Sequence, residues 1–238
     1  SYFWPGPLTM VLNLKVNNEI NLAKNSCSNL KTVGVRSPGH PIARKILRLC
    51  NNPIAAPSAN ISGKLSTTRF EDVLSAFFGK IDAIVDGGPC PIGVESTILQ
   101  VSDKCVTILR PGGFTQEEIE SRIGTTFFHD LTTQGTITAP GQFNSHYCPD
   151  TPLRLNAKIP RNGELLLAFG PLPKGCVGLS LSEISDLNEA AMNLYSCLTD
   201  LDNLAKIEKS QSIAVNSIPN IGLGIAINDR LKRAAEQC

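Results

Sequence analysis

The sequence predicts an α/β protein with two structured regions and a linker between them. Short strand patterns alternate with amphipathic helix patterns along most of the chain. Motifs rich in Gly and Pro gather in residues 1–124, and residues 125–152 show no periodicity. We therefore expect a first domain over 1–124, a linker over 125–152 and a small α/β domain over 153–238.

Local patterns predict the elements of the first region. Residues 32–36 alternate polar and apolar side chains, which is typical of a strand. Residues 37–50 carry an apolar stripe at helical spacing, with Pro38 in the first turn. The pairs Thr68/Glu71 and Thr115/Glu118 are capping-box patterns, each predicting the start of a helix. Further strands are expected over 81–85, 94–101 and 105–109.

The second region predicts a single small α/β layer. Strands are expected over 164–169, 177–181 and 212–215, and the chain should close with a helix over 228–236. A stripe at helical spacing lies between the second and third of these strands and should be core: Leu187, Ala191, Leu194, Leu198 and Leu201. Because these patterns are self-contained, we expect residues 153–238 to fold independently.

Composition excludes several classes of protein. The 238 residues are 42% hydrophobic and 18% charged, which is globular rather than disordered. A formal net charge of +1 gives no general attraction for long nucleic acids or anionic membranes. No apolar run approaches the roughly 20 residues of a membrane span, and no secretory signal is visible. We expect a cytoplasmic protein without membrane association.

The eight cysteines do not have the spacing of a metal site. None forms a Cys-x-x-Cys pair, and the chain has only three histidines. Structural zinc sites usually contain close ligand pairs. We predict no metal site, and we expect reduced, mostly buried thiols.

Residues 53–68 carry the densest cluster of short polar side chains. Hydroxyls, an amide and backbone N–H groups can hold phosphate oxygens without a large positive cluster. The candidates in this loop are Ser58, Asn60 and Ser66. The alternative is an ordinary surface turn.

One face of the predicted strand 32–36 suits a ligand with two parts. Residues two apart share a face, so Thr32, Gly34 and Arg36 point the same way. At roughly 3.3 Å per residue, Thr32 and Arg36 lie about 13 Å apart. The planar fork of Arg36 can donate two parallel hydrogen bonds to a carboxylate. The alternative for Arg36 is a surface salt bridge.

Two further motifs are candidates for ligand contacts. Residues 86–97 contain three glycines that permit close approach of a ligand, and Asp86 and Glu95 are either an acid/base pair or loop-ordering residues. Arg110 ends a predicted strand and can reach an anion. The chain has no phosphate-loop, dinucleotide or nucleophile-elbow motif, so no catalytic side chain is assigned.

Taken together, these motifs resemble the YrdC-like family, specifically the L-threonylcarbamoyladenylate synthases with an extra C-terminal domain. The resemblance covers nearly the whole chain. It implies a twisted, open YrdC-like α/β sheet domain, here truncated, and a small Rossmann-like α/β C-terminal domain. The matching segments are 4–9, 32–36, 57–63, 93–97, 109–112, 140–149 and 222–230.

The resemblance implies a nucleotidyltransferase. Such enzymes make threonylcarbamoyl-AMP and pyrophosphate from L-threonine, bicarbonate and ATP, with Mg²⁺ accompanying the phosphates. The product then feeds a tRNA threonylcarbamoyl transferase machinery. Chemistry of this kind depends on positioning and charge stabilisation more than on a nucleophilic side chain.

Site residues are carried over position by position. The resemblance implies ATP contacts from Thr32, Ser58, Asn60, Ser66, Arg110 and Ser145. It implies L-threonine contacts from Arg36, Ala56 and Ser96. Ser145 stands where the family usually has a basic residue.

The family's first segment, with its basic triphosphate motif, has no counterpart in residues 1–238. We therefore expect this chain alone to be a poor synthase with an exposed strand edge. Two alternatives remain: a non-catalytic RNA- or nucleotide-binding module, with weak RNA binding, and a carbamoyl-transfer accessory domain as in hydrogenase maturation proteins. The C-terminal extension argues against the accessory domain.

Overall fold

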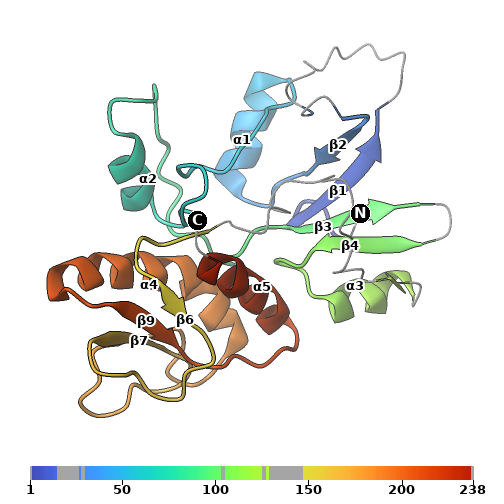
Figure 1. Ribbon diagram of the computed structural model, residues 1–238. Helices are drawn as coiled ribbons and strands as arrows, with labels where there is room; N and C mark the ends of the chain where they lie inside the picture. Colours follow the sequence, from blue (N-terminus) through green and yellow to red (C-terminus); the bar gives the residue numbers. More distant parts are fainter. Residues whose placement is uncertain are drawn as a thin grey trace. The chain divides into compact units, whose positions relative to one another are not determined.

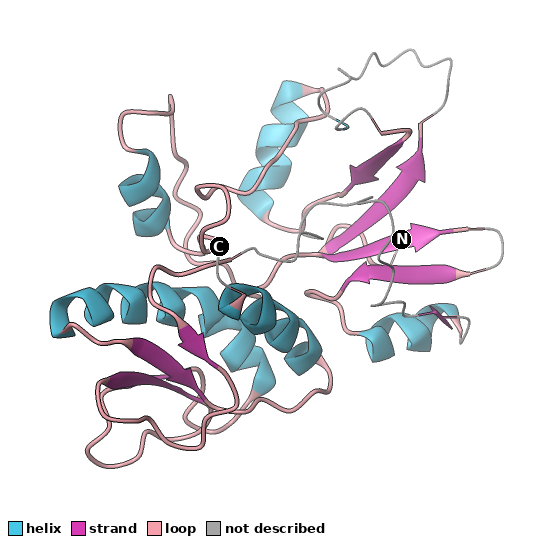
Figure 2. Ribbon diagram, in the orientation of Figure 1, coloured by secondary structure: helices cyan, strands magenta, loops and turns pink. Residues whose placement is uncertain are grey.

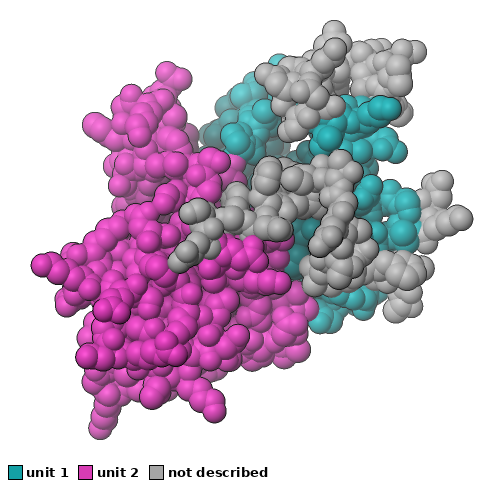
Figure 3. Space-filling view, viewed as in Figure 1, with its two compact units in different colours: residues 1–57, 95–143 teal, residues 58–94, 144–238 magenta. Residues whose placement is uncertain are grey.

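A computed structural model describes residues 2–14, 27, 30–102, 105–124, 127–128 and 147–236. The chain forms two compact units (Figure 3): Ser1–Pro57 with Glu95–Phe143, and Ser58–Val94 with Asn144–Cys238. These units do not follow the predicted domain boundaries, because residues 58–94 group with the C-terminal part of the chain. The boundaries 1–124, 125–152 and 153–238 stay a prediction.

The first unit is built on a five-stranded mixed sheet with the order β2-β1-β3-β4-β5 (Figure 1). β1 runs antiparallel to β2 and parallel to β3, β3 is antiparallel to β4, and β4 is parallel to β5. Among the described strands β2 lies at the sheet edge. The strands are β1 (Leu8–Asn13), β2 (Thr32–Val35), β3 (Thr97–Val101), β4 (Val106–Arg110) and β5 (Phe127–Phe128).

Helix α3 (Gln116–Ile123) covers one face of this sheet. Ile119 is fully buried and packs against Leu8, Leu99 and Ile108. The predicted capping box at Thr115 is confirmed, since both of its reciprocal hydrogen bonds are present. Because side chains alternate along a strand, Thr9 and Val11 of β1 point to the opposite face. That opposite face carries the candidate site.

The strand predictions for the first region missed one strand and placed another where none exists. Strand β1 was not predicted as an element, although its first residues belong to the motif 4–9. Residues 81–85 form no strand, and the chain there is loop (Figure 2). Ile81 and Val85 are exposed, and no described strand pairs with them. A short apolar run forms a strand only where another edge accepts its hydrogen bonds.

Helices α1 (Pro41–Cys50) and α2 (Phe70–Phe77) are present but begin later than predicted. Pro41, rather than Pro38, occupies the first turn of α1. The capping box predicted at Thr68 is wrong, because Arg69 is the N-cap residue of α2 and makes no side-chain cap. Thr68 is buried, and its carbonyl accepts a 2.9 Å hydrogen bond from the Cys90 amide. Neither helix buries a residue, so both apolar stripes stay partly exposed.

The second unit contains a parallel four-stranded sheet with the order β6-β9-β7-β8. Helices α4 (Leu187–Glu208) and α5 (Leu223–Ala235) pack on the sheet face formed by Leu165, Leu167 and Ile213. The three predicted strands are confirmed to within one residue at each end. The strands are β6 (Leu153–Arg154), β7 (Glu164–Ala168), β8 (Gly178–Ser180) and β9 (Ser212–Val215).

The leucine stripe of α4 is confirmed as core. Ala191, Leu194, Leu198 and Leu201 are buried, and Leu187 packs against the same cluster. The last helix is confirmed in type but begins five residues before the predicted start. No described helix is long and apolar enough to cross a bilayer.

Residues 58–94 contribute to this core as well. Leu65, Ile92 and Val94 pack against the cluster that contains the α4 stripe. Gly93 has a φ of +77°, and a Cβ added there would lie 2.1 Å from the Ala191 carbonyl oxygen. Only glycine fits so close to the α4 backbone. Residues 92–94 are therefore packed directly against α4.

Candidate functional site

Three polar residues of the first unit meet on the sheet face opposite α3. In the antiparallel register Met10 lies opposite Val35, and its continuation places Thr9 opposite Arg36. The Thr9 and Ser96 hydroxyl oxygens are 2.8 Å apart and hydrogen-bonded. Directly opposed residues share a face, so Arg36, Thr9 and Ser96 form one row across β2, β1 and the start of β3. We call these three residues the polar row.

Arg110 fixes the end of this row at Ser96. Its Nη2 donates to the Ser96 carbonyl oxygen at 2.9 Å and to the Ser96 hydroxyl oxygen at 3.3 Å. Arg110 and Ser96 are both buried. The Ser96 hydroxyl therefore lies between Thr9 and a guanidinium group, which restricts its rotation. Such a hydroxyl is preorganised to accept or donate one further hydrogen bond to a ligand.

Arg36 lies at the other end of the row and is exposed. It makes no ion pair with any residue that the structure describes, so the salt-bridge alternative has no support there. Gly34 separates Arg36 from the half-buried Thr32, and a Cβ at Gly34 would lie 3.3 Å from the Thr9 methyl group. The guanidinium of Arg36 is consequently available to an anion beside the row.

Residues 58–68 of the predicted polar loop lie in the second unit, where they form an internally hydrogen-bonded structure. The Asn60 amide donates to the carbonyls of Ile61 and Lys64, both at 2.9 Å. The Thr67 hydroxyl donates to the Ala59 carbonyl at 2.9 Å. Asn60 thus orders the loop through its NH₂ group and keeps its carbonyl oxygen for other partners. These hydrogen bonds order the loop internally.

The other predicted contacts differ in exposure. Ser58 and Ala56 are exposed, whereas Ser66 is buried. Ser145 lies outside the described residues, so its nucleotide contact stays a prediction. The predicted residues therefore form two groups. Arg36, Ser96 and Arg110 lie with Thr32 on the first sheet, and Ser58, Asn60 and Ser66 share one loop of the second unit.

Asp86 has a local role in the loop. Its carboxylate accepts a 2.8 Å hydrogen bond from the Gly88 amide, and the residue is exposed. This geometry supports the loop-ordering interpretation of Asp86 over an acid/base role. The Glu95 carbonyl accepts a 2.9 Å hydrogen bond from the Gly113 amide within the first unit.

The described residues contain no group of three or more His, Cys, Asp or Glu side chains that could hold a metal ion. Six described cysteines are free thiols, but Cys148 takes part in a disulfide, which corrects the expectation of uniformly reduced thiols. Cys50 and Cys90 are exposed, so the thiols are not mostly buried either. Partial desolvation raises the pKa of Cys90 above its ordinary value.

Thr9 was missed as a site residue. It belongs to a motif that the sequence analysis quoted, but its closeness to Ser96 depends on the parallel pairing of β1 with β3. The two residues are 87 positions apart, and no local pattern predicts their contact.

Two family models match the chain. The model described as "Telomere recombination" matches residues 1–112. The model for the C-terminal domain of threonylcarbamoyl-AMP synthase matches residues 114–236. Together they span both predicted structured regions.

Curated relatives and solved structures agree with these models. The threonylcarbamoyl-AMP synthases of Bacillus subtilis and Pyrococcus abyssi are each 37% identical to this chain over 98% of its length, which corresponds to 70% and 71% of theirs. The crystal structure of P. abyssi Sua5 complexed with L-threonine matches with a TM-score of 0.83 and 34% identity, over 98% of this chain and 72% of that one. The α/β fold predicted from the family resemblance is thus confirmed. This chain belongs to the threonylcarbamoyl-AMP synthase family of nucleotidyltransferases.

Proposed function

We propose that this protein forms threonylcarbamoyl-AMP and pyrophosphate from L-threonine, bicarbonate and ATP, as its family membership indicates. The observation that supports a site for the amino acid is the polar row. It joins an exposed arginine, which makes no ion pair with any described residue, to two hydrogen-bonded hydroxyls on one sheet face. A structural relative crystallised with L-threonine supports the same ligand.

In this proposal Arg36 binds the carboxylate of L-threonine through its planar fork. Ser96 and the adjacent backbone contact the amino acid, and Arg110 keeps the Ser96 hydroxyl in place. Thr9 is the second support of that hydroxyl. Ala56 completes the threonine contacts through its backbone. The row would thus fix both ends of a small amino acid relative to the sheet.

The nucleotide contacts are proposed from the loop that contains Ser58, Asn60 and Ser66, together with Thr32 and Arg110. Hydroxyl and backbone donors of such a loop suit phosphate oxygens. A carbamate oxygen of N-carboxythreonine attacks the α-phosphorus, and the bond from that phosphorus to the pyrophosphate oxygen breaks. Mg²⁺ held by the phosphates themselves would neutralise the leaving pyrophosphate. The protein contributes orientation and charge stabilisation.

The chemistry of the product indicates what kind of enzyme consumes it. Threonylcarbamoyl-AMP is a mixed anhydride that must be consumed by an acyl-type transfer, and we propose a tRNA threonylcarbamoyl transferase in the cytoplasm as its consumer. The alternative of a non-catalytic RNA-binding module is disfavoured by the net charge of +1 and by the family of the relatives.

Pyrophosphate release tests the proposal. We expect release from ATP only when L-threonine, bicarbonate and Mg²⁺ are all present. Omission of L-threonine is the control for ordinary ATP hydrolysis. Binding of RNA with a steep salt dependence, without pyrophosphate release, would favour the RNA-binding alternative instead.

A further inference from the structure

The loop of residues 58–68 is linked to one helix, α4, at two points: near its middle, at Lys64, and just after its C-terminal end, at Arg69. Its C-terminal end leads directly into Arg69, the N-cap residue of α2. Arg69 donates from Nη1 and Nη2 to the two carboxylate oxygens of Asp200, at 2.9 and 2.7 Å. Asp200 belongs to α4. This is a bidentate pair, which fixes orientation as well as distance.

The same guanidinium is also tied to its own helix. Arg69 Nε and Nη2 donate to the Asp72 carboxylate, both at 3.0 Å. One planar group therefore joins α2 to α4 through four hydrogen bonds. The two carboxylates raise the pKa of Arg69 above its already high value, Asp200 having the larger effect. The guanidinium is a permanent cation whose position is determined by both partners.

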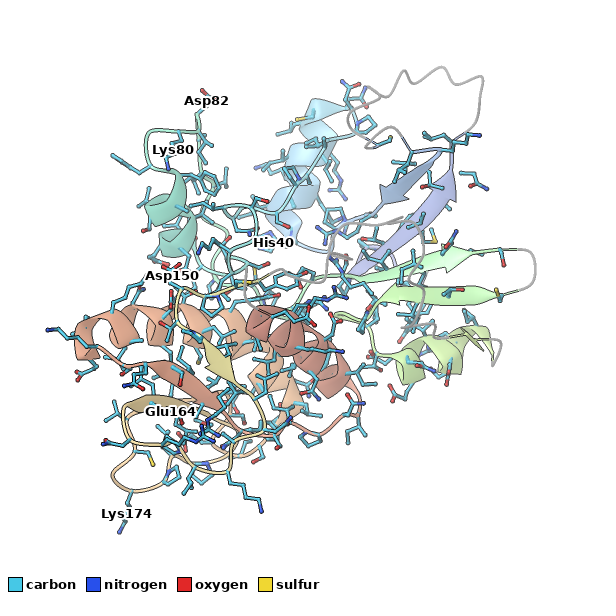
Figure 4. All side chains as sticks on the ribbon, viewed as in Figure 1. His40, Lys80, Asp82, Asp150, Glu164 and Lys174 are labelled. Carbon is cyan, nitrogen blue, oxygen red and sulfur yellow. The ribbon has the colours of Figure 1, made fainter. Side chains whose placement is uncertain are left out.

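The other side of the loop reaches α4 through a chain of ion pairs. The Cys148 amide donates to the Gly63 carbonyl at 2.8 Å, and Lys64 Nζ lies 2.6 Å from the Asp150 carboxylate. The second oxygen of Asp150 lies 2.8 Å from Lys206 Nζ on α4 (Figure 4 labels Asp150). Lys206 and Lys64 lower the pKa of Asp150 to about 2, so this link stays charged at neutral pH.

We propose that α4 sets the position of the nucleotide-binding loop, and that Arg69 and Asp200 are positioning residues for ATP. The inference rests on the proposed function for its ligand, but its geometry comes only from the contacts above. Asn60 and Thr67 order the loop internally, whereas the Arg69–Asp200 pair decides where the ordered loop lies. The C-terminal domain would then contribute to ATP affinity without touching ATP.

Asp200→Asn tests this idea with little change of shape. An amide cannot accept both guanidinium hydrogen bonds, and Asp200 is 46% exposed, so the protein should remain folded. We expect the Kd for ATP to rise about fivefold, the size of effect that a partly exposed bidentate pair supports. The Kd for L-threonine should stay within about twofold, since Arg36 and Ser96 belong to the other compact unit.

Glu71→Gln is the matched control. It removes one negative charge from the first turn of α2, but Glu71 is exposed and has no role in the pair. Arg69→Lys is a second variant, which keeps the charge and loses the fork, and it should weaken ATP binding to an intermediate degree. Equal ATP affinity in Asp200→Asn and wild type, or equal losses for ATP and L-threonine, would overturn the proposal.

Hydrogen exchange separates this proposal from the proposed function. In the absence of any ligand, amides of residues 58–68 should exchange faster in Asp200→Asn than in wild type, while those of β7 should not change. If no variant binds ATP, the proposed function fails, and faster exchange in the loop would still confirm the positioning role. Unchanged exchange throughout the loop would refute that role whether or not ATP binds.

Discussion

Replacement of Arg36 by alanine should remove L-threonine affinity and leave the fold intact. Arg36 is exposed, at the end of an edge strand, and makes no ion pair with another described residue. Its removal therefore breaks no hydrogen bond or ion pair with a described residue, and we expect the melting temperature to change little. The loss should appear almost wholly in ligand binding.

The magnitude follows from the contact that is removed. A charge-assisted pair with a carboxylate contributes on the order of 2–3 kcal/mol when its loss leaves the partner without a counter-charge. Since 1.4 kcal/mol is a factor of ten, the Kd for L-threonine should rise about 30- to 150-fold. The Kd for ATP should change far less. Isothermal calorimetry with each ligand measures both values directly.

Two variants make the experiment specific. Arg48→Ala removes the same charge from the exposed surface of α1 and should leave L-threonine binding unchanged. Arg36→Lys keeps the charge without the fork and should recover only part of the affinity. If Arg36→Ala binds L-threonine as wild type does, the polar row is not the carboxylate site and its assignment is wrong.

Three further predictions concern the row, a partly buried ion pair and a close backbone contact. Thr9→Val, which removes the hydroxyl beside Ser96, should weaken L-threonine binding about fivefold in a titration. The Arg154 guanidinium lowers the pKa of Glu164 to about 2. The stability that this pair contributes is therefore present above the ordinary pKa of about 4.5 and is lost as the pH falls toward 2, and acid unfolding measures this loss. Gly93→Ala should destabilise the second unit by about 2 kcal/mol or more, measured by thermal unfolding, because its Cβ would overlap the α4 backbone.

Each of these has an outcome that contradicts it. Unchanged titration of Thr9→Val would mean that Arg110 alone orients Ser96. An acid-unfolding curve that is unaffected by Arg154→Met between pH 4.5 and 2 would show that the ion pair has no linkage to folding. A melting temperature of Gly93→Ala equal to that of wild type would mean that the backbone at residue 93 can move away from α4 at no cost.

Local patterns in the sequence were sufficient for several elements. The capping box at Thr115 and the leucine stripe of α4 were both predicted and are both present. The strand around Gly34, with its Arg and Thr on one face, was also predicted. These features depend on residues within a few positions of one another, so a local sequence pattern is enough to predict them.

The remaining features depended on partners that are distant in the sequence. Residues 81–85 have strand-forming side chains but no described edge to pair with, and Thr68 lost its cap role because its carbonyl bonds the Cys90 amide. Thr9 meets Ser96 only through the pairing of β1 with β3, and Arg69 meets Asp200 across 131 residues. The sequence alone therefore determined the α/β class, the main motifs and the candidate ligand residues. Only the tertiary structure decided which of these residues contact one another, because hydrogen bonds and ion pairs between distant segments produce no periodic pattern in the sequence.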